Sequence, residues 1–418
     1  MHRFVRKPIF IKNFSRGYTT VNNINQVVIA SATRTPVGCF NGSLKKLTAP
    51  ELGAIAAAGA IEKAGLKPEQ IEEVYMGNVI QANLGQSPAR QVALKAGCKH
   101  STEATTINKV CASGMKAVIL AAQNLALGNR SIMIAGGMES MSNTPFYSPR
   151  NTVYGHQILA DAIIKDGLWD VYNQIHKHLA KLFKKGNCAE NTAKNYDISR
   201  EIQDMHAAES YRRAAEAWRN GVFKAEVVPV TVKDRKKDTI VDEDEEYKNV
   251  KFDRIPELKP VFQPNGGTVT AANASTINDG ASALVLMTRA KAEELCIKPL
   301  ARILSYGDAA VEPIDFPIAP SHSLPIALKK AGLRISDISL FEFNEAFSVV
   351  IRANEKILGL DPAKVNIAGG AVALGHPIGS SGSRIIVTLT HLLKSGQIGA
   401  ASICNGGGGA SSIIIEKL

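Results

Sequence analysis

Two stretches of the chain are alike, SGMKAVILAAQNLALG (113–128) and SGSRIIVTLTHLLKSG (381–396). Each begins with Ser-Gly, continues as an apolar helix and stops at a glycine after the same number of residues. A short apolar strand follows in both cases, SIMIA (131–135) and AASIC (400–404), and leads into further glycines. Two copies of one helix-and-strand unit, 268 residues apart, predict two related α/β halves rather than a long solenoid.

The segments ahead of the first copy fit the same fold class. VVIASATR (27–34) and VYMGNVI (74–80) are apolar, β-branched runs that predict buried strands. Between them, ELGAIAAAGAIEKAG (51–65) predicts a helix that ends at Gly65. Strands that alternate with helices predict a parallel α/β sheet.

Residues 140–277 separate the two halves and resemble neither. They include a helical stretch, QDMHAAESYRRAAEAW (203–218), and a charge run, DRKKDTIVDEDEEYK (234–248), that predicts an exposed hairpin or loop. We interpret this region as a loop domain inserted into the first half, where it would cap a site between the halves.

Composition excludes several classes of protein. The chain has 418 residues, of which 45% are hydrophobic and 21% charged, which is typical of a soluble globular protein of two or three units. No apolar run approaches the ~18–20 residues that a membrane helix needs. The six cysteines contain no Cys-x-x-Cys pair, which argues against a disulfide framework or a zinc site and favours a reducing compartment.

The net charge of +11 comes from two local sources. Residues 1–20 contain five basic residues and no acidic one, and 177–185 contain four lysines, so the rest is nearly balanced. Net charge therefore gives no reason to infer DNA binding. A basic, acid-free N-terminus with interspersed apolar residues predicts a mitochondrial transit peptide over 1–20, cleaved near Tyr18. A disordered basic tail or a nucleic-acid patch is the alternative.

Four side chains are candidates for chemistry. Cys111 precedes the first repeated helix, where free N–H groups and the helix dipole are expected to lower a thiol pKa. Cys404 ends a strand before four glycines, which allow close approach of a ligand to the backbone. His376 precedes the second repeated helix, and Asn344 lies in FEFNEAF. Taken singly, each has a structural alternative: a core cysteine, a flexible turn or phosphate cradle, a structural histidine, a helix cap.

The combination is more informative than its members. The repeat places the Cys111 and His376 loops at equivalent positions ahead of two helix N-termini, and Cys404 follows one strand later. Two cysteines, a histidine and a glycine-rich stretch of amides supply a nucleophile, its base, a second acid/base and donors for an oxyanion.

Five blocks carry a resemblance to a known family: NKVCASGMKA, GGMESMS, NEAF, GGAVALGHPIGSSGSR and CNGGGGAS, in this order. The chain resembles the thiolases over about residues 25–418, and the second cysteine distinguishes it from the condensing enzymes of fatty-acid synthesis. The resemblance implies two βαβαβαββ halves packed as five layers (αβαβα) with an inserted loop domain. The implied parts are the transit peptide 1–20, a first half 21–139 with 278–299, a loop domain 140–277 and a second half 300–418.

The resemblance also implies a role for each candidate. Cys111 is the nucleophile that becomes acetylated, and His376 activates it and helps to bind the thioester oxygen. Cys404 exchanges the proton at the enolate carbon. Asn344 holds a water that completes one oxyanion hole with His376, and the backbone N–H groups of Cys111 and Gly406 form the other.

Among thiolases the chain is most similar to the mitochondrial members that cleave acetoacetyl-CoA with coenzyme A into two acetyl-CoA. The pair Phe316-Pro317 matches the one that makes room for a 2-methyl branch. A thiolase for longer 3-ketoacyl chains and a non-catalytic acyl-CoA-binding scaffold are the alternatives. The scaffold predicts a lost catalytic group, and none is lost.

Ligand positions follow from the resemblance as well. The positions that match potassium ligands are Tyr211, Ala271, Ala272, Ala274 and Val372. The positions that match coenzyme A contacts are His176, Tyr211, Asn249, Val250, Lys251, Arg254 and Ser275. Where the family has Arg-Val-Asp, this chain has Asn249-Val250-Lys251, so its adenine and phosphate contacts are expected to differ.

The largest departure from the family is KHLAKLFKK at 177–185. We interpret it as a tolerated loop extension. The alternatives are a membrane or partner site, or a stretch introduced by incorrect prediction of the gene's coding sequence. The resemblance further implies a homotetramer in the mitochondrial matrix that binds acyl-CoA substrates, with no nucleic acid or membrane as partner.

Overall fold

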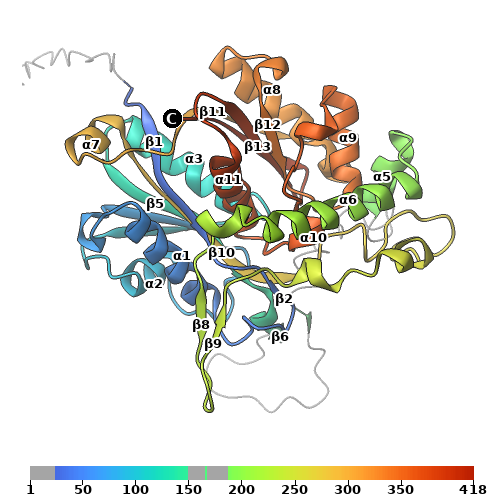
Figure 1. Cartoon of the computed structure of the whole chain (residues 1–418), viewed down its shortest axis with the longest axis horizontal. Coiled ribbons are helices and arrows are strands. Elements are labelled where there is room, and N and C mark those ends of the chain that lie inside the picture. Colours follow the sequence, from blue (N-terminus) through green and yellow to red (C-terminus); the bar gives the residue numbers. More distant parts are fainter. Residues whose placement is uncertain (1–23, 149–164, 167–186) are drawn as a thin grey trace, which may run out of the picture.

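The computed structural model describes residues 24–148, 165–166 and 187–418 (Figure 1). The elements of the first half are, in order, β1 (Val27–Arg34), α1 (Ala49–Lys63), β3 (Glu73–Gly77), α2 (Pro88–Lys95), β4 (Glu103–Ile107), α3 (Ser113–Ala126), β5 (Ile132–Ser140) and β10 (Asn278–Thr288). The second half repeats this order with β11 (Ala301–Ala310), α8 (Pro320–Ala331), β12 (Leu340–Phe343), α9 (Ser348–Leu358), α11 (Ser381–Leu392), β13 (Ile398–Asn405) and β14 (Gly409–Lys417). A single parallel bridge from Val365 to Phe341 takes the place of a counterpart to β4.

The strands of both halves form one continuous sheet, in the order β12-β13-β14-β11-β1-β10-β5-β3-β4. The halves meet where β1 and β11 pair antiparallel over only two residue pairs, Val28 with Arg302 and Ile29 with Ala301. On either side of this junction the strands follow in equivalent order. The two related halves expected from the repeat are therefore confirmed.

Three separate cores show how the layers are stacked. One lies between α1, α2 and the strands of the first half and includes Val74. Another lies between α8, α9 and the strands of the second half and includes Phe341. Between the two sets of strands, α3 and α11 share a central core that includes Met115 and Ile385. Figure 1 shows α3 and α11 in the middle of the molecule, with the other helix pairs outside, so the five-layer arrangement is confirmed.

Two expectations from the sequence are wrong in detail. The sheet is mixed, because β3 is parallel to both β4 and β5 whereas β10 and β14 are antiparallel to their neighbours. A tight turn joins β13 to β14, and such a turn permits only antiparallel pairing. The second repeated helix does not run to Gly396: α11 ends at Leu392, because Leu393 is extended and buried in the central core.

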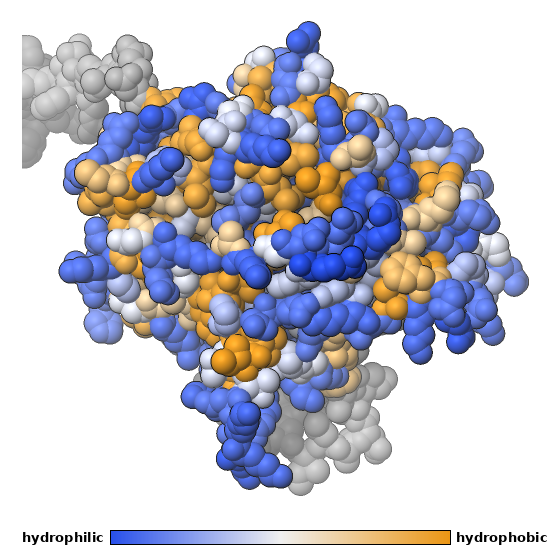
Figure 2. Space-filling model, in the orientation of Figure 1, coloured by the Kyte–Doolittle hydropathy of each residue, from blue (hydrophilic) through white to orange (hydrophobic). Residues whose placement is uncertain are grey.

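The region between the halves contains α5 (Asn187–Asn195), α6 (Arg200–Arg219), the antiparallel strands β8 (Val230–Val232) and β9 (Thr239–Val241), and the 3-10 helices η5 (Glu246–Asn249) and η6 (Phe252–Glu257). The charge run forms part of the β8–β9 hairpin, whose residues 233–240 are exposed. Figure 2 shows this hairpin as a hydrophilic projection at the foot of the molecule. The expected exposed hairpin is confirmed.

Other short elements include β2 (Gly38–Cys39), β6 (Phe146–Tyr147), β7 (Lys165–Asp166), α7 (Arg289–Glu294), η7 (Pro313–Ile318) and α10 (Ala371–Leu374). Among them, β2 pairs with β10 at the edge of the main sheet, and β6 pairs with β7. The segment η7 packs next to α5 and α9 and carries the Phe316-Pro317 pair.

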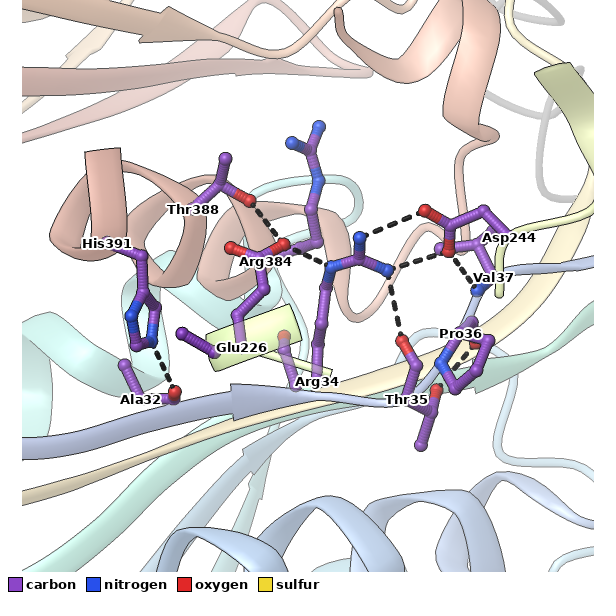
Figure 3. Close-up of polar contacts among 12 residues, drawn as sticks. Ala32, Arg34, Thr35, Pro36, Val37, Glu226, Asp244, Arg384, Thr388 and His391 are labelled. Carbon is purple, nitrogen blue, oxygen red and sulfur yellow. Dashed lines mark hydrogen bonds and ion pairs between the residues drawn. The ribbon is translucent and has the colours of Figure 1, made fainter. Parts of the chain in front are cut away.

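A buried guanidinium connects β1, the loop region and α11 (Figure 3). Arg34 is 1% exposed, and its Nε donates to Glu226 Oε1 at 2.5 Å. Its Nη1 and Nη2 donate to the two carboxylate oxygens of Asp244 at 2.7 and 2.9 Å. The Thr388 hydroxyl of α11 donates to Glu226 at 3.2 Å. A buried charge needs such partners, so these contacts hold the loop region against both halves.

Candidate active site

Helices α3 and α11 approach closely at their first turns. A Cβ placed on Gly114 would lie 2.5 Å from Ser383 Oγ, and one placed on Gly382 would lie 2.6 Å from the Met115 backbone nitrogen. Both distances are too short for any real side chain, so the two glycines are what permits the approach. The crossing brings the turn that carries Cys111 and the loop that carries His376 into one region, as the repeat predicted.

The turn ahead of α3 holds Cys111 in a constrained backbone. Val110 has φ +49°, a left-handed conformation that is unfavourable for a β-branched residue. Ser113 stabilises the turn, because its Oγ accepts from the Lys109 N–H at 2.8 Å and donates to the Val110 carbonyl at 2.5 Å. Such strain, held by local hydrogen bonds, presents the following side chain in one orientation.

The expected low pKa of Cys111 is wrong for the protein alone. Cys111 is 8% exposed, and burial raises the pKa of its thiol to about 11. Hydrogen bonds from the backbone N–H of Gly406 and from its own N–H act in the opposite direction, and the nearby Glu139 carboxylate adds to the increase. The stabilisation of a thiolate by the N-terminus of α3 is smaller than the cost of removing that thiolate from water. The thiol is therefore protonated at rest, and the Gly406 amide lies at hydrogen-bond distance from its sulfur.

Cys404 lies on β13, in register with Ala410 of β14. Burial and the neighbouring Cys111 sulfur raise the pKa of Cys404 far above its usual range. The two thiols are thus close enough to influence each other's ionisation. An apolar cluster of Cys404, Ala346 and Val350, with Phe316 packed against it, encloses this second cysteine.

His376 is oriented with its Nε2 free. Its Nδ1 lies 2.6 Å from Ser381 Oγ, and the same hydroxyl is 3.1 Å from the Pro377 carbonyl. A hydroxyl has one proton, so both contacts are satisfied only when Ser381 donates to Pro377 and accepts from Nδ1–H. Nε2 then carries the lone pair. Burial, and to a smaller extent the positive charge of Arg384, lowers the pKa of the His376 imidazole to about 3. His376 is a neutral base across the physiological pH range.

Several polar atoms of the candidate residues are buried without a hydrogen-bond partner among the residues that the structure describes. They are both side-chain atoms of Asn344 and Nε2 of His376, and Oδ1 of Asn405, the residue after Cys404, is likewise unpaired. Unpaired buried groups are costly and rare, and at a binding site they await a ligand or water. The side chains of Asn344 and His376, which were expected to form one oxyanion hole, are therefore among the buried polar groups left unsatisfied.

Two supporting residues were not predicted from the sequence. Asn278 Oδ1 accepts from the His376 N–H at 2.9 Å, and Asn278 Nδ2 donates to the Gly38 carbonyl at 3.0 Å. Glu345 accepts from Ser210 Oγ at 2.7 Å, Asn366 Nδ2 at 2.8 Å and the Val372 N–H at 3.1 Å. Asn278 is 98 residues from His376, so no local pattern reveals it. Glu345 was visible in the sequence as the neighbour of Asn344.

The structure divides the expected coenzyme A positions into two groups. Ser275 lies at the site, because its N–H and its Oγ donate to the Ala346 carbonyl at 3.1 and 3.0 Å. Asn249, Lys251 and Arg254 are exposed on the loop region, where Arg254 pairs with Glu257 at 2.6 Å. Val250 is partly buried and packs against the cluster that contains Tyr211.

The expected potassium positions are partly brought together. Tyr211 of α6 and Val372 of α10 are both buried and belong to one cluster. Burial and the carboxylates of Glu246 and Glu345 raise the pKa of Tyr211 far above its usual range. The segment that contains Ala271, Ala272 and Ala274 runs beside α6, since Asn273 Nδ2 donates to Asp204 at 2.8 Å.

Three expectations lie outside the described residues: the transit peptide at 1–20, the coenzyme A contact at His176 and the extension at 177–185. Within 24–148 and 187–418, no helix is both long and apolar enough to cross a membrane.

Comparison with known proteins gives consistent matches over nearly the whole chain. The family model described as "Thiolase, N-terminal domain" matches residues 27–290, and the one described as "Thiolase, C-terminal domain" matches residues 297–417. The mitochondrial acetyl-CoA acetyltransferase of Rattus norvegicus is 56% identical, covering 100% of this chain and 99% of its own length. The mitochondrial acetyl-CoA acetyltransferase of Bos taurus is 58% identical over 98% of this chain and 95% of its own.

Solved structures agree. The crystal structure of the Acat5 thiolase of Ascaris suum in complex with coenzyme A superposes with a TM-score of 0.88 at 47% identity, over 94% of this chain and 100% of that one. The acetyl-CoA acetyltransferase of Bacillus anthracis gives a TM-score of 0.89 at 38% identity, over 95% of this chain and 100% of that one.

Proposed function

Because the chain belongs to the thiolase family, we propose that it is an acetyl-CoA C-acetyltransferase. It cleaves acetoacetyl-CoA with coenzyme A into two acetyl-CoA, reversibly, and cleaves the 2-methyl homologue in the same way. One observation carries the proposal: two buried cysteines that interact electrostatically lie at a helix crossing with a histidine whose Nε2 is unpaired.

Acyl transfer to Cys111 begins the reaction. The thiol is protonated at rest, so His376 Nε2 accepts its proton as the sulfur attacks the 3-keto carbon, and no free thiolate accumulates. The tetrahedral oxyanion forms on the carbon bonded to the Cys111 sulfur, and the backbone N–H groups of Cys111 and Gly406 donate to it.

Cleavage of the carbon–carbon bond releases the enolate of acetyl-CoA and leaves an acetyl group on Cys111. Cys404 gives its proton to the enolate carbon, a role that suits a thiol kept protonated by burial. The negative charge of the enolate develops on the thioester oxygen, which accepts hydrogen bonds from the protonated His376 Nε2 and from the water held by Asn344. Coenzyme A then gives its thiol proton to the Cys404 thiolate and takes the acetyl group, and Cys111 leaves as a thiolate that recovers its proton from His376.

Substrate range is the test of this function. Phe316, from the pair that the resemblance associates with a 2-methyl branch, packs against the cluster around Cys404. The purified mature chain is expected to cleave acetoacetyl-CoA and its 2-methyl homologue, and a long-chain 3-ketoacyl-CoA at least about tenfold more slowly. Faster cleavage of the long chain would make it a general 3-ketoacyl-CoA thiolase. No cleavage of any of the three would leave an acyl-CoA-binding scaffold.

The enzyme is mitochondrial, as its relatives are named, and its basic N-terminus is proposed as the import signal. We also propose a division into a first half (21–139 with 278–299), a loop domain (140–277) and a second half (300–418), supported by the equivalent strand order of the halves. The protein is proposed to be a homotetramer, and the residues proposed to contact coenzyme A are His176, Tyr211, Asn249, Val250, Lys251, Arg254 and Ser275.

A potassium ion fits the surroundings of Tyr211. The buried phenol makes no hydrogen bond with a described residue, and two carboxylates face it, which favours a cation. Its phenolic oxygen, with backbone carbonyls of Ala271, Ala272, Ala274 and Val372, would hold the ion. Bound there, the ion would tie α6 to the segment before His376 and order the coenzyme A site.

Potassium is therefore expected to lower the KM for coenzyme A more than it raises kcat, and to raise the melting temperature above that in sodium. Kinetics and thermal unfolding of dialysed enzyme at matched ionic strength measure both. Tyr211→Phe removes one oxygen ligand and is expected to weaken both effects. Equal kinetics and equal melting temperature in potassium, sodium and a large organic cation would exclude the ion.

A further inference from the structure

The ammonium group of Lys109 joins the nucleophile turn to the opposite half of the molecule. Lys109 lies two residues ahead of Cys111 in the first half. Its Nζ contacts Asp308 Oδ1 at 2.5 Å, donates to Ser411 Oγ at 2.8 Å and to the Ala410 carbonyl at 3.2 Å. These three partners belong to β11 and β14 of the second half.

The carboxylate of Asp308 completes a four-residue arrangement. Its Oδ2 accepts from Lys116 Nζ of α3 at 2.7 Å, and its Oδ1 also accepts from Ser411 Oγ at 2.6 Å. Burial opposes ionisation of Asp308, but hydrogen bonds from Lys109, Lys116 and Ser411 outweigh it and lower its pKa to about 2. The carboxylate is thus ionised at physiological pH and holds lysines on both sides of Cys111 in the chain.

The same arrangement reaches the second cysteine. Ala410, whose carbonyl accepts from Lys109, is the register partner of Cys404 in the β13–β14 pair. The turn between these strands carries Gly406, whose N–H bonds the Cys111 sulfur. Lys109 and Asp308 therefore hold the turn that carries Cys111 against the hairpin that carries Cys404 and Gly406. Their contacts lie next to the reacting groups and do not include them.

We propose that Asp308, with Lys109, is a positioning residue that fixes the Cys111 turn against the Cys404 hairpin and so sets the spacing of the two thiols and the Gly406 amide. This inference rests on the proposed function. The pair touches no reacting atom in it. Its effect is geometric: a displacement of about 1 Å at a reacting centre can cost up to about a hundredfold in rate.

The test compares Asp308→Asn with Lys109→Met. Lys109, Lys116 and Asp308 side chains are 25%, 25% and 37% exposed, and ion pairs of this exposure contribute little to stability, so both variants are expected to fold. Each is expected to lower kcat for acetoacetyl-CoA thiolysis about tenfold or more, with the KM for coenzyme A changed less than about twofold. The double variant is expected to be no slower than the slower single variant, because both remove one contact.

The pH dependence of Cys111 alkylation distinguishes an effect on the position of the thiol from a purely electrostatic effect. It can be measured without catalytic turnover. Asp308→Asn leaves two uncompensated lysines near Cys111, whereas Lys109→Met removes a cation. The reaction of Cys111 with iodoacetamide is followed by peptide mass mapping as a function of pH. If the pair acted through charge alone, the pH midpoint of this reaction would move in opposite directions in the two variants. Loss of the Gly406 hydrogen bond raises the midpoint in both, which is the expected result.

The ion pair that joins β11 and β14 at their opposite ends provides a matched control. Arg302 of β11 and Glu416 of β14 are register partners, and Arg302 Nε donates to Glu416 at 2.6 Å. Glu416→Gln is expected to leave kcat and the alkylation midpoint unchanged. Opposite shifts of the midpoint, or wild-type kcat in Asp308→Asn, would overturn the inference. If the wild-type chain cleaved no substrate, the alkylation result would still decide it, so the two failures are distinguishable.

Discussion

Alanine in place of Cys111 is expected to abolish the acetyl-enzyme and to lower thiolysis by about four orders of magnitude or more, the scale of losing a catalytic nucleophile. Cys111 is the thiol placed at the crossing of α3 and α11, with the Gly406 amide at its sulfur. Incubation of wild-type enzyme with labelled acetyl-CoA, followed by peptide mass mapping, should place the label on Cys111 alone. The variant should take up none.

Cys98 is a closely matched control for this experiment. It is 7% exposed, and burial raises its thiol pKa to about 11, as it does for Cys111. It lies in the outer core of the first half, away from the helix crossing. Cys98→Ala should keep both label and turnover. A label on Cys404, or full labelling of the Cys111 variant, would show that the assignment of the nucleophile is wrong.

Serine in place of Cys404 is expected to impair overall turnover but not the half-reaction that acetylates Cys111. The proton delivered to the enolate carbon comes from a thiol that burial keeps protonated, and a serine hydroxyl is a far weaker acid. Acetylation of Cys111 should survive, while overall turnover falls about a hundredfold or more, the scale of losing a general acid or base. Labelling and steady-state kinetics on one preparation measure both quantities.

Cys188 provides the comparison for the serine variant. It is 4% exposed on α5, where its Sγ lies 3.8 Å from the Pro313 carbonyl of η7, so Cys188→Ser makes the same change in another buried position. That variant should retain its turnover apart from any loss of stability. Near-normal turnover of Cys404→Ser, or loss of its acetylation together with its turnover, would contradict a separate role for the second thiol.

The resemblance to the thiolases was sufficient to predict the five layers, and the repeat was sufficient to predict two related halves. It did not predict the junction at β1 and β11 or the mixed sheet, since strand neighbours are chosen by tertiary packing. The end of α11 was also missed, because Leu393 turns into the core where a helical pattern continues. Local sequence carries no information on that choice.

The candidate site, like the fold, could be predicted from the sequence only in part. Cys111, His376, Asn344 and Cys404 stand in conspicuous motifs, and the structure brings their segments together. The ionisation of Cys111 was predicted with the wrong sign, because the helix start is visible in sequence whereas burial is not. Partners such as Asn278 and Asp308 are distant in the chain and meet the site only in the folded protein. The contacts with coenzyme A and potassium stay predictions.

The central place of β1 has a consequence for how the protein is made. This strand emerges early in synthesis, yet its neighbours β10 and β11 come much later; Thr33 and Ala283, which share a hydrogen bond, are 250 residues apart. At roughly 5–20 residues per second, β1 waits on the order of 10–50 s for a partner on either edge. During that time VVIASATR is an apolar strand with both edges open, which is the usual starting point for aggregation. The nascent chain therefore depends on being shielded until residue 310 has been added, and a product truncated before β10 should not fold.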